Sequence, residues 1–182
     1  SMATLISNII IHEGKSQSAL CRGLCSTSAF SRYLNGERTL DRLLFTVVLQ
    51  RLGKSPDKFV TMISDEEYSY LEWKQRVSSA RLNHNWKSLC SLLQEKQAFN
   101  RNCNALLQEQ YFRLMQGILQ ENFFNNRKES ITLIESAIVL TVPGFPADID
   151  KTLFRGKQLL GEQEILAILL WQDLQDNKDM SY

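Results

Sequence analysis

Two cysteines, Cys21 and Cys25, lie four residues apart between Ser16 and Arg38, in a stretch rich in serine and arginine. Thiolates bind zinc or carry out redox chemistry, but two of them supply only half of a tetrahedral zinc site. His12 is the nearest further residue of a ligating type. We therefore predict that Cys21 packs in a core, that Cys25 fills a turn, and that the chain holds no metal or cofactor.

The histidines do not indicate a reactive site either. His12 and His84 stand in no sequence arrangement with serine or carboxylate that is typical of catalysis, and the sequence has no glycine-rich phosphate loop. Cys90 falls on the apolar side of its predicted helix, where a core position is the expected role. The sequence therefore predicts that the protein is not an enzyme.

Residues 27–34 suggest a different chemistry when they are drawn as a helix, with about 100° between successive residues. One face collects apolar side chains: Phe30, Tyr33 and Leu34. The opposite face collects small hydroxyl groups and one guanidinium: Thr27, Ser28, Ser31 and Arg32. These groups hydrogen-bond base edges and phosphates, and small side chains let a helix enter the major groove of DNA. The alternative interpretation is a solvated polar face on a small helical domain.

Five short helices are predicted to position these side chains, over residues 4–12, 17–24, 27–34, 40–52 and 55–63. Ser16 and Ser26 precede the second and third of them, and serine is a favoured N-cap residue. Cys25 and Ser26 form a very short predicted turn between these two helices. Asn35-Gly36 supplies the left-handed residue that ends the third helix. Two short helices joined by a tight turn are typical of the helix-turn-helix plan.

Longer amphipathic helices are predicted after residue 63, over residues 65–81, 86–99, 104–121, 128–141 and 162–176. The first follows the capping box Ser64-Asp65-Glu66-Glu67. The first four form two antiparallel hairpins whose starts lie about 39 residues apart, close to the period of a tetratricopeptide-like (TPR-like) repeat. The last is apolar on all sides from Ile165 to Trp171, so we expect a second copy, or further repeats of a longer protein, to cover it.

The composition favours an all-α protein, because 43% of the 182 residues are hydrophobic while proline and glycine number only three and eight. Residues 1–63 carry eight Lys or Arg and four Asp or Glu, a net charge of +4, and the remainder carries −3. A basic head on an acidic body is a common plan for a DNA-binding regulator, so we predict two domains, 1–63 and 64–182. Four cysteines without CxxC spacing, and no membrane-length apolar run, predict a cytoplasmic protein.

The sequence SQSALCRGLCSTSAFSRYLNGER, residues 16–38, resembles the Cro-like helix-turn-helix signature in the short-turn variant of Gram-positive regulators. The segments LQRLGKSPDKF, residues 49–59, and LTVPGF, residues 140–145, extend the resemblance over most of the chain. The chain is similar to clostridial helix-turn-helix regulators with a TPR-like C-terminal region. It is also similar to the RRNPP group, the peptide-controlled transcription factors.

This resemblance implies a role for each matching residue. Residues implied to contact base edges or phosphates are Gln17, Thr27, Ser28, Arg32, Asn35 and Arg38. The polar face of the predicted helix adds Ser31 to the candidate DNA-binding residues. Residues implied to pack the core of the motif are Leu20, Cys21, Leu24, Phe30 and Tyr33. The chain departs from the family pattern at Leu34, where glutamate is usual, and at His12, Glu13 and Lys15, where arginines are usual.

Together, these observations predict a sequence-specific transcriptional regulator with recognition helix 27–34 in the major groove of double-stranded DNA. It would bind a palindromic operator as a homodimer through Ile165, Leu169 and Trp171. Polar residues of the TPR-like region could pair with an extended signalling peptide: Asn104, Gln110, Arg113, Gln116 and Gln120. An ordinary solvated face is the alternative for that set. The alternative function is a helical-repeat protein-interaction scaffold with a degenerate DNA-binding head.

Overall fold

The computed structural model describes residues 2–59, 65–95, 105–147 and 158–176, and all regular structure in these ranges is helical. The protein is therefore all-α, as its composition predicts. The chain packs into two compact units. The first comprises residues 1–61 and 138–168, and the second comprises residues 62–137 and 169–182. Within the described ranges, none of the helices is both long and apolar enough to cross a membrane.

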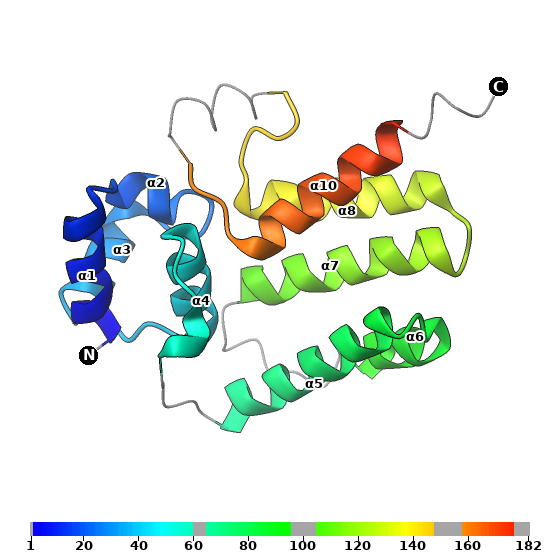
Figure 1. Cartoon of the computed structure of the whole chain (residues 1–182), viewed down its shortest axis with the longest axis horizontal. Coiled ribbons are helices and arrows are strands. Elements are labelled where there is room, and N and C mark those ends of the chain that lie inside the picture. Colours follow the sequence, from blue (N-terminus) through cyan, green and yellow to red (C-terminus); the bar gives the residue numbers. More distant parts are fainter. Residues whose placement is uncertain (1, 60–64, 96–104, 148–157, 177–182) are drawn as a thin grey trace. The chain divides into compact units, whose positions relative to one another are not determined.

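The first unit begins with the helices α1 to α4, which are blue to cyan in Figure 1. They are α1 (Met2–Glu13), α2 (Gln17–Cys21), α3 (Thr27–Leu34) and α4 (Arg42–Arg51). The helix α3 contacts α1 and α2, and α2 contacts α4. The end of α8 (Arg127–Thr141) and the first half of α10 (Glu162–Asp176) complete this unit.

Side-chain caps fix the starts of the short helices. Ser16 Oγ accepts a hydrogen bond from the Ala19 N–H at 3.1 Å and so caps α2. Ser26 Oγ caps α3 in the same way through the Ala29 N–H, also at 3.1 Å. Both helices therefore begin at the predicted residues. The helix α2 ends at Cys21, three residues before the predicted end, because Arg22 leaves the helical conformation with ψ of 128° and Gly23 follows with φ of 76°.

The fifth helix predicted over residues 55–63 is wrong in its described part. Only Pro56–Lys58 form a 3-10 turn, η1, and Phe59 has an extended backbone. The side chain of Ser55 makes no capping hydrogen bond, so the signal of serine before proline starts a turn and not an α-helix. Residues 60–64 lie outside the described residues, and the predicted capping box at Ser64 falls among them.

The core of the first unit is assembled from α1, α2, α3 and α4. Its buried members are Ile6, Ile10, Leu20, Cys21, Phe30, Leu40, Leu44, Phe45, Val48, Leu49 and Leu52. Leu24 and Tyr33 pack against this cluster and are partly buried, so all five core residues implied by the family resemblance lie in or on it. Phe45 and Phe59 add an edge-to-face ring contact with centroids 6.3 Å apart.

The second unit is built from α5 (Asp65–Leu82), α6 (Trp86–Gln94), α7 (Ala105–Asn122), most of α8 and the end of α10. The helix α6 contacts both α5 and α7. Trp73 links two of these helices, because its indole N–H donates a hydrogen bond of 2.8 Å to the carbonyl of Leu92. The helices α7 and α8 approach closely at Gly117, where a Cβ would lie 2.6 Å from Ile134 Cγ1.

These helices match the predicted positions closely at their starts. The helix predicted over residues 86–99 is described only to residue 95, and residues 96–104 lie outside the described residues. The division into domains at residues 63 and 64 stays a prediction, because a packing unit is not the same as an independently folding domain. The packing units add one fact that the sequence did not indicate, because the described residues 138–147 and 158–168 pack with the N-terminal helices.

Candidate nucleic-acid interface

The link between α2 and α3 comprises residues 22–26 and is longer than the two-residue turn that the sequence predicted. The N–H groups of Leu24 and Cys25 both donate to the carbonyl of Cys21, at 2.9 and 3.1 Å. A Cβ on Gly23 would collide with the backbone carbonyl of Thr141. Glycine is therefore required here both by its positive φ and by the close approach of Thr141, the last residue of α8.

The helix α3 has the two faces that the helical wheel predicted. Phe30 is fully buried, and Tyr33 packs partly buried against the same core. Thr27, Ser28 and Arg32 are exposed on the opposite face. Ser31 is only half-buried, so it lies at the border between the two faces. The exposed part of α3 therefore consists of hydroxyl groups and one guanidinium.

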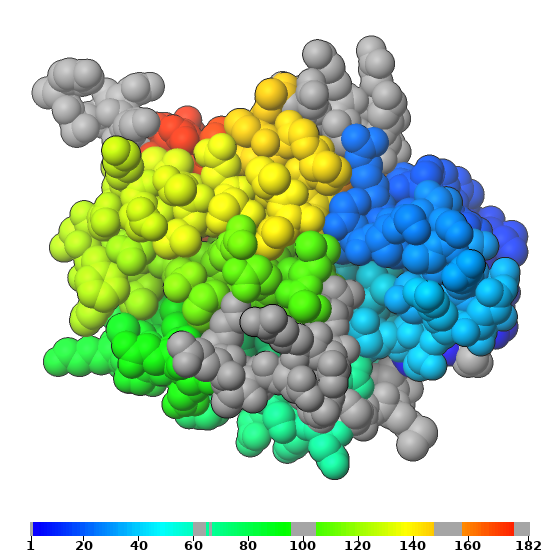
Figure 2. Space-filling view, turned by 180° about the vertical axis from the view of Figure 1, so that it is seen from behind, coloured from blue at the N-terminus to red at the C-terminus, as the bar shows by residue number. Residues whose placement is uncertain are grey.

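Three further candidate residues lie around α3 and are all exposed: Gln17, Asn35 and Arg38. Gln17 is the first residue of α2, and Asn35 follows the last residue of α3. The Asn35 side-chain amide lies 3.5 Å from the Glu37 carboxylate. The N-terminal segment that carries α1–α4 presents a broad exposed surface, drawn in blue and cyan in Figure 2. Every proposed DNA contact except Ser31 is thus accessible to solvent.

The structure shows the surroundings of Leu34 and Glu13, two of the positions at which the chain departs from the pattern that it resembles. Leu34 is partly buried against the core, so at this position an apolar side chain replaces the usual glutamate without leaving a hydrophobic group in water. Near the end of α1, Glu13 accepts a hydrogen bond of 2.7 Å from Lys54 Nζ. That bond and the charge of Lys54 lower the pKa of Glu13. The end of α1 is therefore occupied by a local ion pair.

Cys21 and Cys25 take the structural places that the sequence predicted, whereas Cys90, predicted for a core position, is only half-buried. Cys21 is 2% exposed within the core, and its sulfur lies 3.8 Å from the carbonyl of Ser18 and from the hydroxyl of Thr27. Cys25 lies in the link, where burial and then the neighbouring Cys21 raise its pKa to about 11. At neutral pH such a thiol is protonated and a poor nucleophile. Cys103 lies outside the described residues.

No group of three or more metal-ligating side chains occurs in the part of the chain that the structure describes. A cavity of about 420 Å³ opens beside the link between α2 and α3. It is lined by small and polar residues: Ser18, Cys21, Arg22, Gly23, Cys25, Ser26 and Thr27. This hollow is continuous with the N-terminus of α3 and belongs to the same candidate interface.

The candidate peptide-binding residues do not form the expected exposed row. Gln110 is 1% exposed and lies inside the second unit, so its assignment to an open groove is wrong. Arg113 Nε donates to Glu109 at 2.9 Å one helical turn away, which engages its guanidinium. Gln116 and Gln120 are half-buried on α7, and Asn104 lies outside the described residues. The helical spacing of these residues alone did not reveal which of them faces the core.

The candidate dimerisation residues on α10 differ in exposure. Ile165 is 45% exposed and Leu169 is 58% exposed, one helical turn further along. Trp171 is half-buried. The buried side chains on this helix include Glu164, Ala167 and Leu174. The helix therefore buries one stripe within the chain and leaves two of its large apolar residues in contact with solvent.

Sequence reasoning missed a charged pair inside the first unit. Arg51 Nε donates a hydrogen bond of 3.1 Å to Glu164, and Arg51 Nη2 donates to the other oxygen of the same carboxylate. The two side chains are 0% and 2% exposed. On α4, Arg51 lies on the same buried face as Leu44 and Val48. On α10, Glu164 lies on the same buried face as Ala167 and Leu174. A charge at a core position of each helix was the signal that could have revealed the pair.

A polar cavity of about 520 Å³ in the second unit was also missed. It lies between α5 and α6 and is lined mostly by amide, hydroxyl and charged side chains: Glu72, Gln75, Arg76, Ser79, Ala80, Asn83, Asn85, Ser88 and Leu92. Several of these residues lie four apart on α5, and that spacing of polar side chains could have indicated a shared face.

The chain matches no family model, no curated protein and no solved structure. The candidate interface therefore rests on its own geometry and chemistry.

Proposed function

We propose that the protein is a sequence-specific DNA-binding transcriptional regulator, with α2 and α3 as a helix-turn-helix and α3 as the recognition helix. The observation that carries the proposal is the exposed face of α3, where Thr27, Ser28 and Arg32 project from a helix anchored in the core by Phe30. Arginine binds guanine O6 and N7 bidentately, and hydroxyl groups bind bases or phosphates. The charge of +4 on residues 1–63 favours attraction to phosphate.

The remaining helices supply the regulatory part of the proposal. The pairs α5–α6 and α7–α8 are proposed as TPR-like hairpins. Exposed Ile165 and Leu169 on α10 are proposed to contact a second copy of the chain, which would give a homodimer. A two-fold symmetric dimer would place one α3 in each half-site, about one DNA turn apart, so its operator would be palindromic.

The test is selection of duplexes from a random 30-base-pair library with the full chain, followed by fluorescence anisotropy on the recovered sequence. We expect a palindromic site and an affinity that falls steeply with salt. Arg32→Ala should cost about 1–3 kcal/mol and relax sequence preference at one position in each half-site. Arg38→Ala should weaken binding to all sequences alike and lower the salt slope by about one for each protomer.

Lys87→Ala is the matched control, because Lys87 is an exposed cation on α6 in the second unit. It should leave both the affinity and the salt slope unchanged. If neither the selected duplexes nor a random duplex binds at 50 mM salt, or if Lys87→Ala weakens binding as much as Arg32→Ala, the proposal is wrong.

A second candidate function is recognition of an extended peptide, and the polar cavity between α5 and α6 favours it. Gln75 and Asn83 offer amide groups that can pair with both the N–H and the C=O of a peptide backbone. The test is selection from a displayed library of random dodecapeptides. Gln75→Ala and Asn83→Ala should each weaken the recovered peptide several-fold, whereas Gln172→Ala on α10 should not. Equal effects of all three variants would exclude this cavity as the peptide site.

A further inference from the structure

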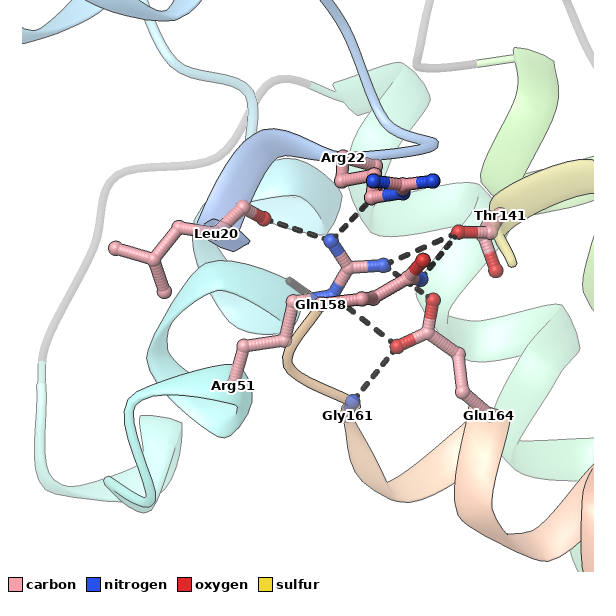
Figure 3. A network of polar contacts seen from close by, with 7 residues as sticks. All are labelled: Leu20, Arg22, Arg51, Thr141, Gln158, Gly161 and Glu164. Atoms are coloured by element: carbon pink, nitrogen blue, oxygen red, sulfur yellow. Dashed lines mark hydrogen bonds and ion pairs between the residues drawn. The ribbon is translucent and has the colours of Figure 1, made fainter. Parts of the chain in front are cut away.

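We propose that Glu164, the third residue of α10, is a positioning residue for the DNA-contacting helices, and that it acts through Arg51. The inference rests on the proposed function, since it concerns how α2 and α3 are held for contact with DNA. Its starting point is the buried network of Figure 3, in which one guanidinium joins α4, the end of α2, the end of α8 and the start of α10.

The first step is the contact between Arg51 and α2. Arg51 Nη1 donates to the carbonyl of Leu20 at 2.7 Å and to the carbonyl of Arg22 at 2.8 Å. These carbonyls belong to the last turn and the C-cap of α2, where a helix leaves its acceptors without intrahelical partners. A five-residue helix has little stability of its own, so its end depends on such contacts. Arg51 therefore fixes where α2 stops and where the link to α3 begins.

The second step is the contact between Arg51 and Glu164. Both carboxylate oxygens of Glu164 accept from the guanidinium, and Oε2 also accepts from the Gly161 N–H at 2.7 Å. The carboxylate is thereby locked at the N-terminal end of α10. A buried guanidinium without a counter-charge is strongly disfavoured, so Glu164 is what allows Arg51 to stay in place. The orientation of the Arg51 side chain thus follows the position of α10.

The third step concerns the last residue of α8, Thr141, and Gln158, which precedes α10. Arg51 Nη2 also donates to the carbonyl of Thr141 at 3.4 Å, and Gln158 Nε2 donates to the same carbonyl at 2.8 Å. That carbonyl closes over Gly23 in the link between α2 and α3. The link is therefore held from two sides, by Arg51 through the α2 carbonyls and by Thr141 through direct contact. A displacement of α10 would change both supports at once.

The test compares Glu164→Gln with Glu162→Gln in the full chain. Glu162 lies on the same helix and accepts a hydrogen bond of 3.1 Å from Gln50 of α4, but that contact is exposed. Glutamine keeps the shape of glutamate and removes its charge. We expect Glu164→Gln to speed hydrogen exchange at the Leu24 and Cys25 amides at least tenfold, while amides of α1 change less than twofold. Glu162→Gln should leave all of these rates unchanged.

A second variant keeps the test decisive if Glu164→Gln unfolds the chain. In the double variant Arg51→Met with Glu164→Leu, apolar side chains replace both charges, a change that buried ion pairs often tolerate. We expect this variant to keep its helical circular dichroism. It should still exchange the Leu24 and Cys25 amides at least tenfold faster, because the carbonyls of Leu20 and Arg22 lose their donor.

The DNA measurement uses the duplex recovered by selection, and both variants should bind it at least tenfold more weakly, while Glu162→Gln binds normally. Unchanged exchange at Leu24 and Cys25, equal acceleration throughout α1 and α4, or local acceleration with unchanged DNA affinity would each overturn the inference. If the unmodified chain binds no duplex at low salt, the proposed function fails, and the exchange rates alone decide whether Glu164 positions α2 and the link.

Discussion

The two units of the chain hold their interiors together by different chemistry. The first unit contains a fully buried ion pair, Arg51 with Glu164, whose guanidinium also serves the backbone of α2. The second unit uses a cluster of aromatic side chains, with Lys74 Nζ 4.6 Å from the centroid of the Tyr111 ring. Trp73 lies edge-on to Tyr111, with ring centroids 6.0 Å apart, and the hydroxyls of Tyr111 and Ser78 lie 3.0 Å apart.

We infer that the packing of helices in the first unit depends strongly on one residue pair, whereas the packing in the second unit depends on how well many apolar side chains fit together. A buried charge that loses its partner is costly, so we expect the pair to restrict how its helices are arranged. Aromatic side chains contribute area and weak geometric preferences, and they tolerate small shifts. The first unit should therefore respond more sharply to single substitutions than the second, and the expected effects below are ordered by size.

The largest effect is expected for Arg51→Met, which leaves the carboxylate of Glu164 buried without its counter-charge. Loss of one partner from a buried pair costs about 3–5 kcal/mol. We expect the free energy of opening of the first unit, measured by hydrogen exchange of the slowest α4 amides, to fall by that amount. Trp73→Phe in the second unit removes one neutral hydrogen bond and should cost about 1–2 kcal/mol. Equal costs would contradict the contrast between the units.

Gly23→Ala should have the next largest effect and lower the free energy of unfolding of the first unit by about 2–4 kcal/mol. The added methyl meets the backbone of Thr141, which cannot move aside as a side chain can, and the positive φ adds strain. Gly53→Ala is the control, because Gly53 also has a positive φ, of 68°, but a Cβ there meets nothing within 4 Å. Its cost should be about 1–2 kcal/mol, from strain alone. Urea unfolding followed by circular dichroism measures the difference.

Alkaline pH should weaken the second unit through its buried tyrosines. Burial, and then the neighbouring Tyr111, raises the pKa of Tyr70, and burial also raises the pKa of Tyr111. Tyrosines in the unfolded chain lose their protons near pH 10. The contribution of the two buried tyrosines to the free energy of unfolding is therefore fully present below about pH 10 and falls as the pH rises further. Each tyrosine contributes a slope of up to about 1.4 kcal/mol per pH unit.

Tyr70→Phe should make the free energy of unfolding fall less steeply with pH, by up to about 1.4 kcal/mol per pH unit, the contribution of one tyrosine. The measurement is urea unfolding between pH 9 and 11, followed by tryptophan fluorescence, which reports on the second unit because Trp73, Trp86 and Trp171 all belong to it. An unchanged slope in Tyr70→Phe would mean that Tyr70 titrates alike in the folded and unfolded chain.

The smallest effects, about 1 kcal/mol each, are expected for the helix caps Ser26→Ala in the first unit and Asn85→Ala in the second. Asn85 Oδ1 accepts from the Ser88 N–H at 3.1 Å and caps α6, as Ser26 caps α3. Because a cap acts locally, the two costs should be similar despite the different interiors. A markedly larger cost for Ser26→Ala would show that the start of α3 is coupled to the buried network. Thermal unfolding of both variants under one condition makes the comparison.

Local patterns predicted the helices well where the deciding interactions are themselves local. Ser16 and Ser26 cap the helices that they were predicted to start, and the buried Phe30 lies opposite the exposed Arg32 as the helical wheel required. The same approach failed at residues 55–63, where serine and proline form only a 3-10 turn before Phe59 becomes extended. It also failed at Gln110, since helical spacing does not say which polar residue faces the core.

The sequence by itself determined the all-α class, the bounds of α3 and the two chemical faces of that helix. Periodicity and caps act over a few residues, so they can be read without knowing the fold. Only the tertiary structure decided that the end of α8 and the start of α10 pack with the N-terminal helices, and that Arg51 meets Glu164, 113 positions later. Such contacts depend on which helices pack together. A lone charge on an apolar stripe indicates that a partner is needed, but it does not identify the partner.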